Sequence, residues 1–291
     1  MPEKVKRVTS FLISMRSLLR MAWKKTKKTA QIIRLFFLLG AGAFLLGGCA
    51  GVSVEPVRAS LEKESVPVLL YHHIADLPEN AGRALKRWTL SPKKFEAHLA
   101  WIVAHGFHPV SLAQLVAHRK EGIALPASPI VLTFDDGWKD QYTGAFPLLV
   151  KYKIPATFFI ITDSIGHSAY MDWRQLEELA TAGMDVEPHS HTHSQLTVLP
   201  EKYLSREIIE PKNILESRLR KPAVVFAYPF GDYNDEVISM VKQAGFDAAV
   251  SVNGLNNGYI FRRDQTFTLA RYALEGDDDL EQVARAKGFY Q

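Results

Sequence analysis

The sequence predicts an α/β fold in which about seven parallel strands form a closed or nearly closed barrel. From Val66 onward, short apolar runs alternate with helical stretches, and this alternation is typical of parallel βαβ units. Polar clusters directly follow four of the expected strands, as they do when an active site lies at the carboxyl ends of barrel strands. At 291 residues, the chain is long enough for one such domain.

The expected elements follow from local patterns along the chain. Ser91 and Pro92 form a good N-cap and first helical position, and Gly183 and Gly245 are placed to end helices. The expected strands are 66–71, 129–134, 156–162, 184–187, 223–228, 247–252 and 268–273, and the expected helices are 91–106, 111–118, 141–152, 173–182, 203–219 and 235–244.

The charge of the chain is unevenly distributed. Residues 1–48 hold ten Lys or Arg and one acid, Glu3, whereas the rest of the chain holds 25 basic and 30 acidic residues. The body is therefore mildly acidic, which argues against a basic surface for nucleic acid. We expect no nucleic-acid partner.

The N-terminal segment has the pattern of an export signal. Its basic residues precede an apolar run at 35–46, which is shorter than the roughly 20 residues of a transmembrane helix. The sequence Leu46-Gly47-Gly48-Cys49 resembles the lipobox of bacterial lipoproteins. We therefore expect residues 1–48 to be a lipoprotein-type signal peptide, Cys49 to be lipidated and 49–65 to be a tether.

This pattern predicts an exported protein that a lipid at Cys49 anchors to the periplasmic face of an outer membrane or to the cell surface. Cys49 is the only cysteine, so no internal disulfide can form. An uncleaved anchor helix with an incidental cysteine is the alternative. Met1, Met15 and Met21 are all candidate starts, because the basic region is long.

Two histidines four residues apart are the first candidate metal ligands. His189 and His193 can bring two imidazoles onto one ion in a helical turn or a tight loop. Histidine-rich turns also occur on ordinary solvated surfaces, so a carboxylate is needed to complete the set. Zinc is the default ion, with cobalt, iron, manganese or nickel as alternatives. His191, between the two, is expected to point away.

A pair of aspartates supplies that carboxylate. Asp135 and Asp136 end the apolar strand 129–134, and their side chains diverge, so one can bind a metal while the other contacts water. Asp-Gly is also a common turn dipeptide. An ordinary turn is the less favoured interpretation, because the strand places both residues on the expected active face.

Together these residues resemble the NodB-type polysaccharide deacetylases, carbohydrate esterase family 4. The motif Thr-Phe-Asp-Asp-Gly stands unchanged at 133–137, the histidine signature stands at 189–193, and the resemblance covers roughly 66–273. It implies a distorted (β/α) barrel with about seven strands in a deacetylase domain at 66–291. It also implies that Asp135 is the general base and that Asp136, His189 and His193 bind the metal.

The resemblance implies an acid and an oxyanion donor as well. Leu69-Leu70-Tyr71-His72 fits the family's Leu-x-x-His motif, so His72 is the expected acid that protonates the departing amine, with a buried structural histidine as the alternative. His73 is expected to turn the other way. The backbone N–H of Phe230 is the expected oxyanion donor.

Two features depart from the family pattern. The motif that contains His72 comes first in this chain instead of last, as in the circularly permuted branch that includes the poly-β-1,6-N-acetylglucosamine deacetylases. The arginine that orients the base is replaced by Ala227. Arg271, on the expected last strand, is a candidate to supply that charge, and a surface salt bridge is its alternative.

The expected activity is metal-dependent hydrolysis of N-acetyl groups on an extracytoplasmic N-acetylglucosamine polymer. Biofilm poly-β-1,6-N-acetylglucosamine is the first choice of substrate, with export machinery for that polymer as an expected partner. Peptidoglycan, chitin oligomers and O-acetylated glycans are alternatives. A non-catalytic glycan-binding lipoprotein is a further alternative, although loss of catalysis should first damage the acid, base and metal set.

Overall fold

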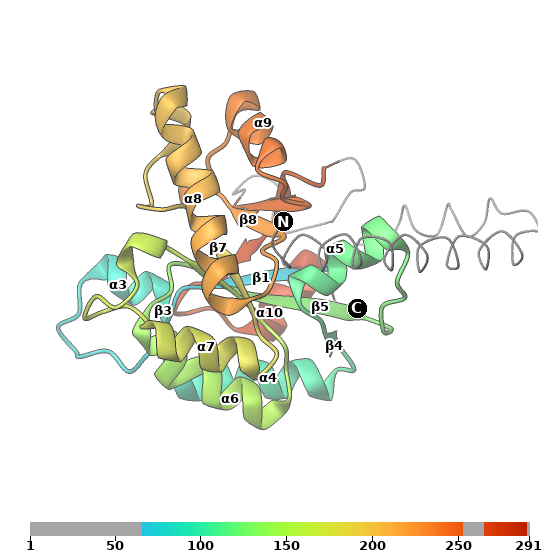
Figure 1. The fold of residues 1–291 in the computed structure, drawn as a ribbon. Helices are drawn as coiled ribbons and strands as arrows, with labels where there is room; N and C mark the ends of the chain where they lie inside the picture. The colour runs from blue at the N-terminus through green and yellow to red at the C-terminus, as the bar shows by residue number, and fades with distance from the viewer. Residues whose placement is uncertain (1–65, 253–264, 290–291) are drawn as a thin grey trace, which may run out of the picture. The chain divides into compact units, whose positions relative to one another are not determined.

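Seven strand positions form a barrel-like, parallel arrangement in the computed structural model, which describes residues 66–252 and 265–289 (Figure 1). The expectations for the signal peptide, Cys49 and the tether lie outside these residues. The strands of the barrel are β1 Val68–Tyr71, β5 Pro129–Phe134, β6 Thr157–Ile160, β7 Asp185–Pro188, β8 Val225–Ala227, β9 Ala248–Ser251, and the successive short strands β10 Leu269–Ala270 and β11 Tyr272–Ala273.

The strands pair in two parallel groups. One runs in the order β11-β1-β5-β6-β7 and the other in the order β10-β9-β8. A short strand, β4 (His108–Pro109), pairs with the beginning of β5, and β2 (His73–Ile74) pairs with β3 (Thr89–Leu90) beside the barrel. Because all these pairs are parallel, the carboxyl ends of the barrel strands lie at one end, where the sequence places its polar clusters.

A different residue marks each of the two seams between these groups. At the β7–β8 seam, the buried Glu187 carboxylate accepts the backbone N–H groups of Val224 and Val225, at 2.9 and 3.0 Å. Burial raises the pKa of Glu187 well above its usual range. At the other seam, Arg271 stands between β10, which pairs with β9, and β11, which pairs with β1.

The helices begin and end at local signals. Side-chain caps at Ser91, Ser111 and Asp172 accept the expected backbone N–H groups, and Gly183 follows its helix with φ 90°. Figure 1 shows α8 and α9 on one side of the strands and α4, α6 and α7 on the other. The helices are α3 Arg83–Trp88, α4 Pro92–Ala104, α5 Leu112–Glu121, α6 Phe146–Tyr152, α7 Trp173–Thr181, α8 Glu201–Leu219, α9 Asp235–Gln243 and α10 Leu280–Lys287.

Two expected elements differ in the structure. The single strand expected at 268–273 is two short strands, because residues on either side of Arg271 pair with different neighbours. The helix expected at 141–152 begins with a π-helical turn, Gln141–Ala145. Pro147 explains this widening, since it has no N–H to donate and its ring would clash with the preceding helical turn. The elements α3, α10, β2, β3 and β4 were not expected from the sequence.

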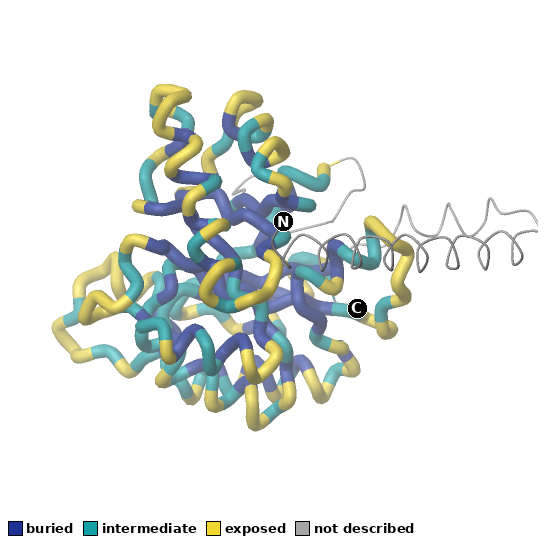
Figure 2. The backbone as a smooth tube through the Cα atoms, viewed as in Figure 1, coloured by how far each residue is buried: buried dark blue, intermediate teal, exposed yellow. Residues whose placement is uncertain are grey.

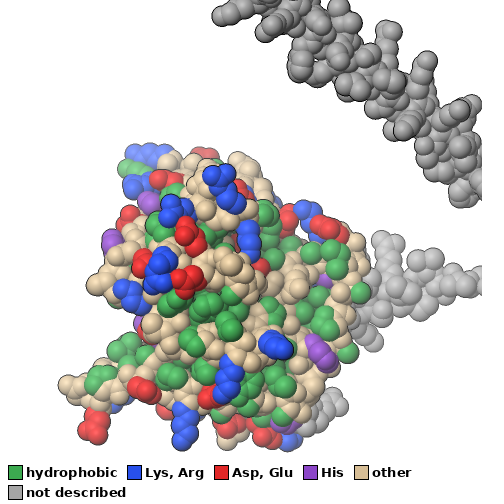
Figure 3. Space-filling view, turned by 60° about the horizontal axis from the view of Figure 1, so that its bottom comes forward, with side chains coloured by type: hydrophobic (Ala, Val, Ile, Leu, Met, Phe, Trp, Pro, Cys, Tyr) green, Lys and Arg blue, Asp and Glu red, His purple; other side chains and the backbone are tan. Residues whose placement is uncertain are grey.

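The core lies on both sides of the strands. Figure 2 shows the strands as buried and the outer faces of the helices as exposed. On the face drawn in Figure 3, basic and acidic side chains are interspersed. Within 66–252 and 265–289, no helix combines the length and the apolar character needed to span a membrane.

Candidate active site

A pocket of about 430 Å³ lies at the carboxyl ends of the barrel strands. Its volume is within the usual range of small-molecule sites. The strands β1, β5, β7 and β8 each lead directly into residues of its wall. The lining residues are His72, His73, Trp88, Asp135, Asp136, Trp138, His189, His193, Tyr228, Phe230, Gly231 and Val252. The structure therefore brings together the polar clusters that the sequence predicts to converge.

Asp136, His189 and His193 form the one group within the described residues that can hold a metal ion. Asp136 Oδ1 lies 3.6 Å from Nε2 of His189 and 3.5 Å from Nε2 of His193. These separations are long for hydrogen bonds but suit atoms that share one ion. Two imidazoles and one carboxylate are also a common donor set for zinc. The three residues therefore fit a divalent metal.

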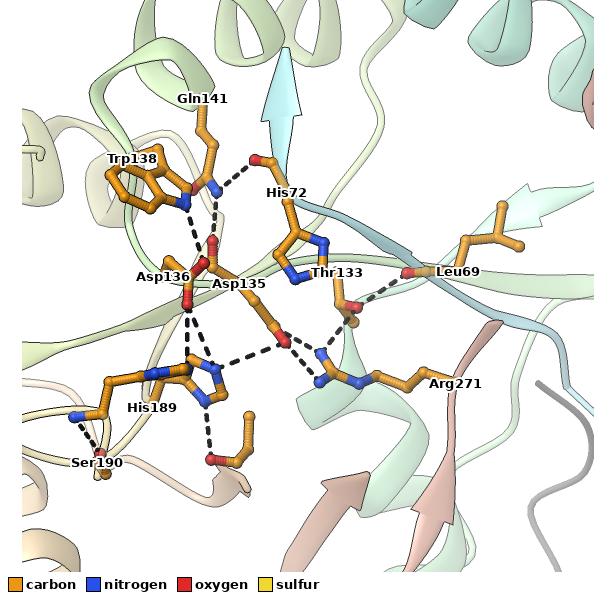
Figure 4. Close-up of polar contacts among 12 residues, drawn as sticks. Leu69, His72, Thr133, Asp135, Asp136, Trp138, Gln141, His189, Ser190 and Arg271 are labelled. Carbon is orange, nitrogen blue, oxygen red and sulfur yellow. Dashed lines mark hydrogen bonds and ion pairs between the residues drawn. The ribbon is translucent and has the colours of Figure 1, made fainter. Parts of the chain in front are cut away.

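The surrounding structure fixes the orientation of these side chains. His189 Nδ1–H donates to the carbonyl of Ala227 at 2.9 Å, which leaves the lone pair of Nε2 facing Asp136. Trp138 Nε1–H donates to Oδ2 of Asp136 at 2.9 Å, as Figure 4 shows. The Ser190 hydroxyl accepts the backbone N–H of His193.

The loop that carries the two histidines is held from α8. Glu207 is 5% exposed, and its two carboxylate oxygens accept the backbone N–H and the hydroxyl of Thr192, at 2.9 and 2.8 Å. His191 is also buried, and its Nδ1 lies 2.9 Å from the hydroxyl of Thr162. His191 therefore packs behind the loop and does not belong to the group of candidate ligands.

Four residues at the site have a left-handed backbone that non-glycine residues seldom adopt. The φ angles are 76° at Asp136, 62° at Ser190, 60° at His193 and 59° at Phe230. Such strained conformations cluster at functional sites, where the surrounding structure holds them in place. Here the strain falls on two candidate ligands and on the residue expected to supply an oxyanion donor.

Asp135 and Arg271 form a buried, bidentate ion pair. The two guanidinium nitrogens donate to Oδ1 and Oδ2 at 2.6 and 2.7 Å, and the side chains are 2% and 0% exposed (Figure 4). Arg271 is therefore not part of a surface salt bridge. Burial raises the pKa of Asp135, but the adjacent Arg271 guanidinium, through its charge and its hydrogen bonds, is the main opposing cause, and the pKa is lowered to about 2. Asp135 is thus ionised near neutral pH.

His72 lies beside this pair with its ring against Trp88, at a centroid distance of 4.8 Å. Its Nδ1 is buried and has no hydrogen-bond partner among the described residues. Burial lowers the pKa of His72, and the charges of Asp135 and Asp136 partly oppose that shift. The carbonyls of His72 and Asp135 both accept from the side-chain amide of Gln141, at 2.7 and 2.5 Å. Gln141 thus ties together the ends of β1 and β5.

His73 also lines the pocket, although strand alternation predicts the opposite direction. The reason is that β1 ends at Tyr71 and a separate strand, β2, begins at His73, so the alternation does not continue. His73 Nδ1 lies 2.7 Å from Oδ2 of Asp140. Phe230 is 60% exposed, and its ring lies 4.5 Å from that of His193.

Three contributors were missed in the sequence: Trp88, Trp138 and Gln141. Trp138 immediately follows the Asp-Asp-Gly turn, and this position was the available signal for its proximity to Asp136. Gln141 carries no comparable signal, because its role depends on the π-helical turn that begins there. Trp88 ends α3, a helix that local patterns did not indicate.

A parallel barrel-like fold, a candidate metal triad and a buried Asp–Arg pair at the carboxyl ends of the strands fit the chemistry of a hydrolase. Residues 123–249 match the polysaccharide deacetylase family. The chain therefore contains a polysaccharide deacetylase domain of the NodB type, a class of hydrolases that act on N-acetyl amide bonds.

Individual relatives support this assignment. The chain is 28% identical to a Bacillus subtilis protein described as a candidate polysaccharide deacetylase, YxkH, over 64% of each chain. It is 24% identical to the poly-beta-1,6-N-acetyl-D-glucosamine N-deacetylase of Staphylococcus aureus, over 81% of this chain and 88% of the relative. A crystal structure of a polysaccharide deacetylase from Bacillus cereus matches with a TM-score of 0.68 and 26% identity, over 77% of this chain and 69% of that one.

Proposed function

We propose that the protein removes N-acetyl groups from an extracytoplasmic polymer of N-acetylglucosamine, with poly-β-1,6-N-acetylglucosamine as the first choice. The observation that carries this proposal is the convergence of the Asp135–Arg271 pair, the metal triad and His72 in one pocket. Similarity to the staphylococcal deacetylase supports the choice of polymer. The complete set of reactive residues favours an enzyme over a glycan-binding lipoprotein.

The proposed metal site consists of Asp136, His189 and His193, with zinc as the first choice and cobalt, iron, manganese or nickel as alternatives. A bound divalent ion supplies Lewis acidity, which polarises an acetyl carbonyl and makes water more acidic. The protein holds His189 in place before metal binding, through the carbonyl of Ala227.

The proton transfers are proposed to involve two residues. Asp135 is ionised and takes a proton from the attacking water, because each of its oxygens retains a free lone pair beside Arg271. The imidazolium form of His72, which is held against Trp88 and which the charges of Asp135 and Asp136 favour against burial, gives a proton to the departing amine. The backbone N–H of Phe230 is proposed to donate to the oxygen that becomes negative in the transition state.

A glycan panel with and without a chelator tests the function. We expect acetate release from β-1,6-linked N-acetylglucosamine oligomers, loss of that release after chelation, and recovery on adding zinc or cobalt. His189→Ala should contain little metal by elemental analysis, because it removes one of three protein ligands. Chitin oligomers and peptidoglycan serve as comparison substrates. Activity that is unaffected by chelation contradicts the metal proposal, and preference for another glycan replaces the choice of polymer.

We also propose that a lipid on Cys49 anchors the exported protein to the membrane, near machinery that exports the polymer. The support is the lipobox-like sequence that ends at Cys49. Cys49→Ser should move the protein from the membrane fraction to the soluble fraction, because the sole lipidation site is lost. Retention of Cys49→Ser in the membrane would instead identify the apolar run at 35–46 as the anchor.

A further inference from the structure

Trp138 has a contact that the catalytic scheme leaves unassigned. Its indole N–H donates to Oδ2 of Asp136 at 2.9 Å, while Oδ1 of the same carboxylate faces His189 and His193. The two oxygens of Asp136 therefore have different neighbours. A carboxylate can rotate about its terminal bond, which is only weakly restrained by torsion, so an outside contact must decide which oxygen faces the histidines.

The indole is itself held in place by other rings. The ring of Tyr170 stacks on it at a centroid distance of 4.3 Å and an interplanar angle of 21°. Residues 138 and 170 also form an antiparallel bridge, and the Lys139 N–H donates to the Ala169 carbonyl at 2.8 Å. The turn after β5 is thus tied to the loop before α7.

A second support comes from β2. The ring of His73 packs against the indole at 4.5 Å, and Nδ1 of His73 lies 2.7 Å from Oδ2 of Asp140. The other oxygen of Asp140 accepts the backbone N–H of Ile74 at 3.1 Å. Asp140 therefore holds the His73 ring in place, and that ring packs against the Trp138 indole.

We infer that Trp138 is a positioning residue that holds Asp136 with Oδ1 toward the ion, an inference that rests on the proposed metal site. A tryptophan in a sugar pocket can also serve as a stacking surface for substrate. Here the indole already stacks on Tyr170, and its N–H is directed at a ligand. Groups that orient metal ligands in this way typically affect metal affinity by about 10–100-fold.

Metal affinity tests this role directly. Trp138→Phe keeps an aromatic ring in place and removes the N–H. We expect the zinc dissociation constant of the metal-free protein to rise by about 10–100-fold, measured by competition with a chromophoric chelator. Trp88→Phe is the matched control, because Trp88 lines the same pocket but packs against His72. Its zinc affinity should equal that of the wild type.

A spectroscopic readout and a second variant separate positioning from general damage. In the cobalt-substituted protein, Trp138→Phe should shift the visible absorption bands, because the carboxylate no longer has a fixed orientation. Tyr170→Leu leaves the N–H in place but removes the ring that stacks on the indole, so it should weaken zinc binding in the same direction and by less. This variant keeps the inference testable if Trp138→Phe does not fold.

Two outcomes have different meanings. If Trp138→Phe binds zinc as tightly as the wild type and its cobalt spectrum is unchanged, the positioning role is wrong while the metal site stands. Equal losses in Trp138→Phe and Trp88→Phe also overturn it, because the effect would then not depend on the contact with Asp136. If the wild type binds no metal, the proposed metal site itself fails.

Discussion

Asp135→Asn is expected to lower kcat by about 10²–10⁴-fold while leaving the metal content unchanged. Asparagine has nearly the same shape, and its amide oxygen can still accept from Arg271. It cannot take a proton from water, because the amide is not basic. Since Asp135 is outside the group of three candidate ligands, the metal should remain bound.

The matched variant is Asp136→Asn, which makes the same replacement of a carboxylate oxygen by an amide nitrogen in the neighbouring residue. It should reduce metal content, whereas Asp135→Asn should not, and elemental analysis with acetate release distinguishes the two. His72→Ala should also lower kcat and retain metal, because it removes the proposed acid. If Asp135→Asn retains turnover close to that of the wild type, Asp135 is not the base.

Local sequence patterns predicted much of the barrel because its strands and helix ends depend on nearby residues. Strand β5 agrees with the expected bounds, 129–134, and the helix cap expected at Ser91 is formed. The break at Arg271 could not be predicted in this way. It depends on which strands, far away in the chain, lie on each side of residues 269–273.

The same distinction applies to the site. The convergence of His72, Asp135 and His189 follows from the rule that parallel strands carry their sites at their carboxyl ends. The contact between Trp138 and Asp136 depends on the path of a turn, which composition does not specify. The direction of His73 was wrong for a similar reason, because it assumed that the strand continued beyond Tyr71.

Arg271→Met is expected to have the largest effect on stability, lowering the free energy of unfolding by about 3–5 kcal/mol near neutral pH. Methionine fills part of the volume but leaves the Asp135 carboxylate buried without its partner. The barrel seam at β10 and β11 also loses the side chain that contacts Thr133 at 3.2 Å. Urea unfolding of the variant and the wild type measures the difference.

The pH dependence of that difference identifies the buried charge as its cause. In the wild type, the pKa of Asp135 is about 2, which is below the ordinary value of an aspartate. The ion pair therefore stabilises the fold fully at pH values above that ordinary pKa, and this stabilisation is lost as pH falls toward 2. In Arg271→Met, no guanidinium opposes the effect of burial, so the pKa of Asp135 rises. The stability deficit should therefore be largest above this raised pKa and shrink as pH falls through it. A deficit that is constant between pH 4 and 7 would instead point to packing.

The same variant connects stability to catalysis. A raised pKa moves the acid limb of the kcat/KM profile to higher pH, because Asp135 must be ionised to accept a proton. Arg271→Lys keeps one positive charge without the bidentate geometry, so it should lie between the wild type and Arg271→Met in both measurements. In the double variant Asp135→Asn/Arg271→Met, the loss of stability should be smaller than the sum of the single losses, because no unpaired charge remains buried. Additive losses would mean that the ion pair does not set the pKa of the proposed base.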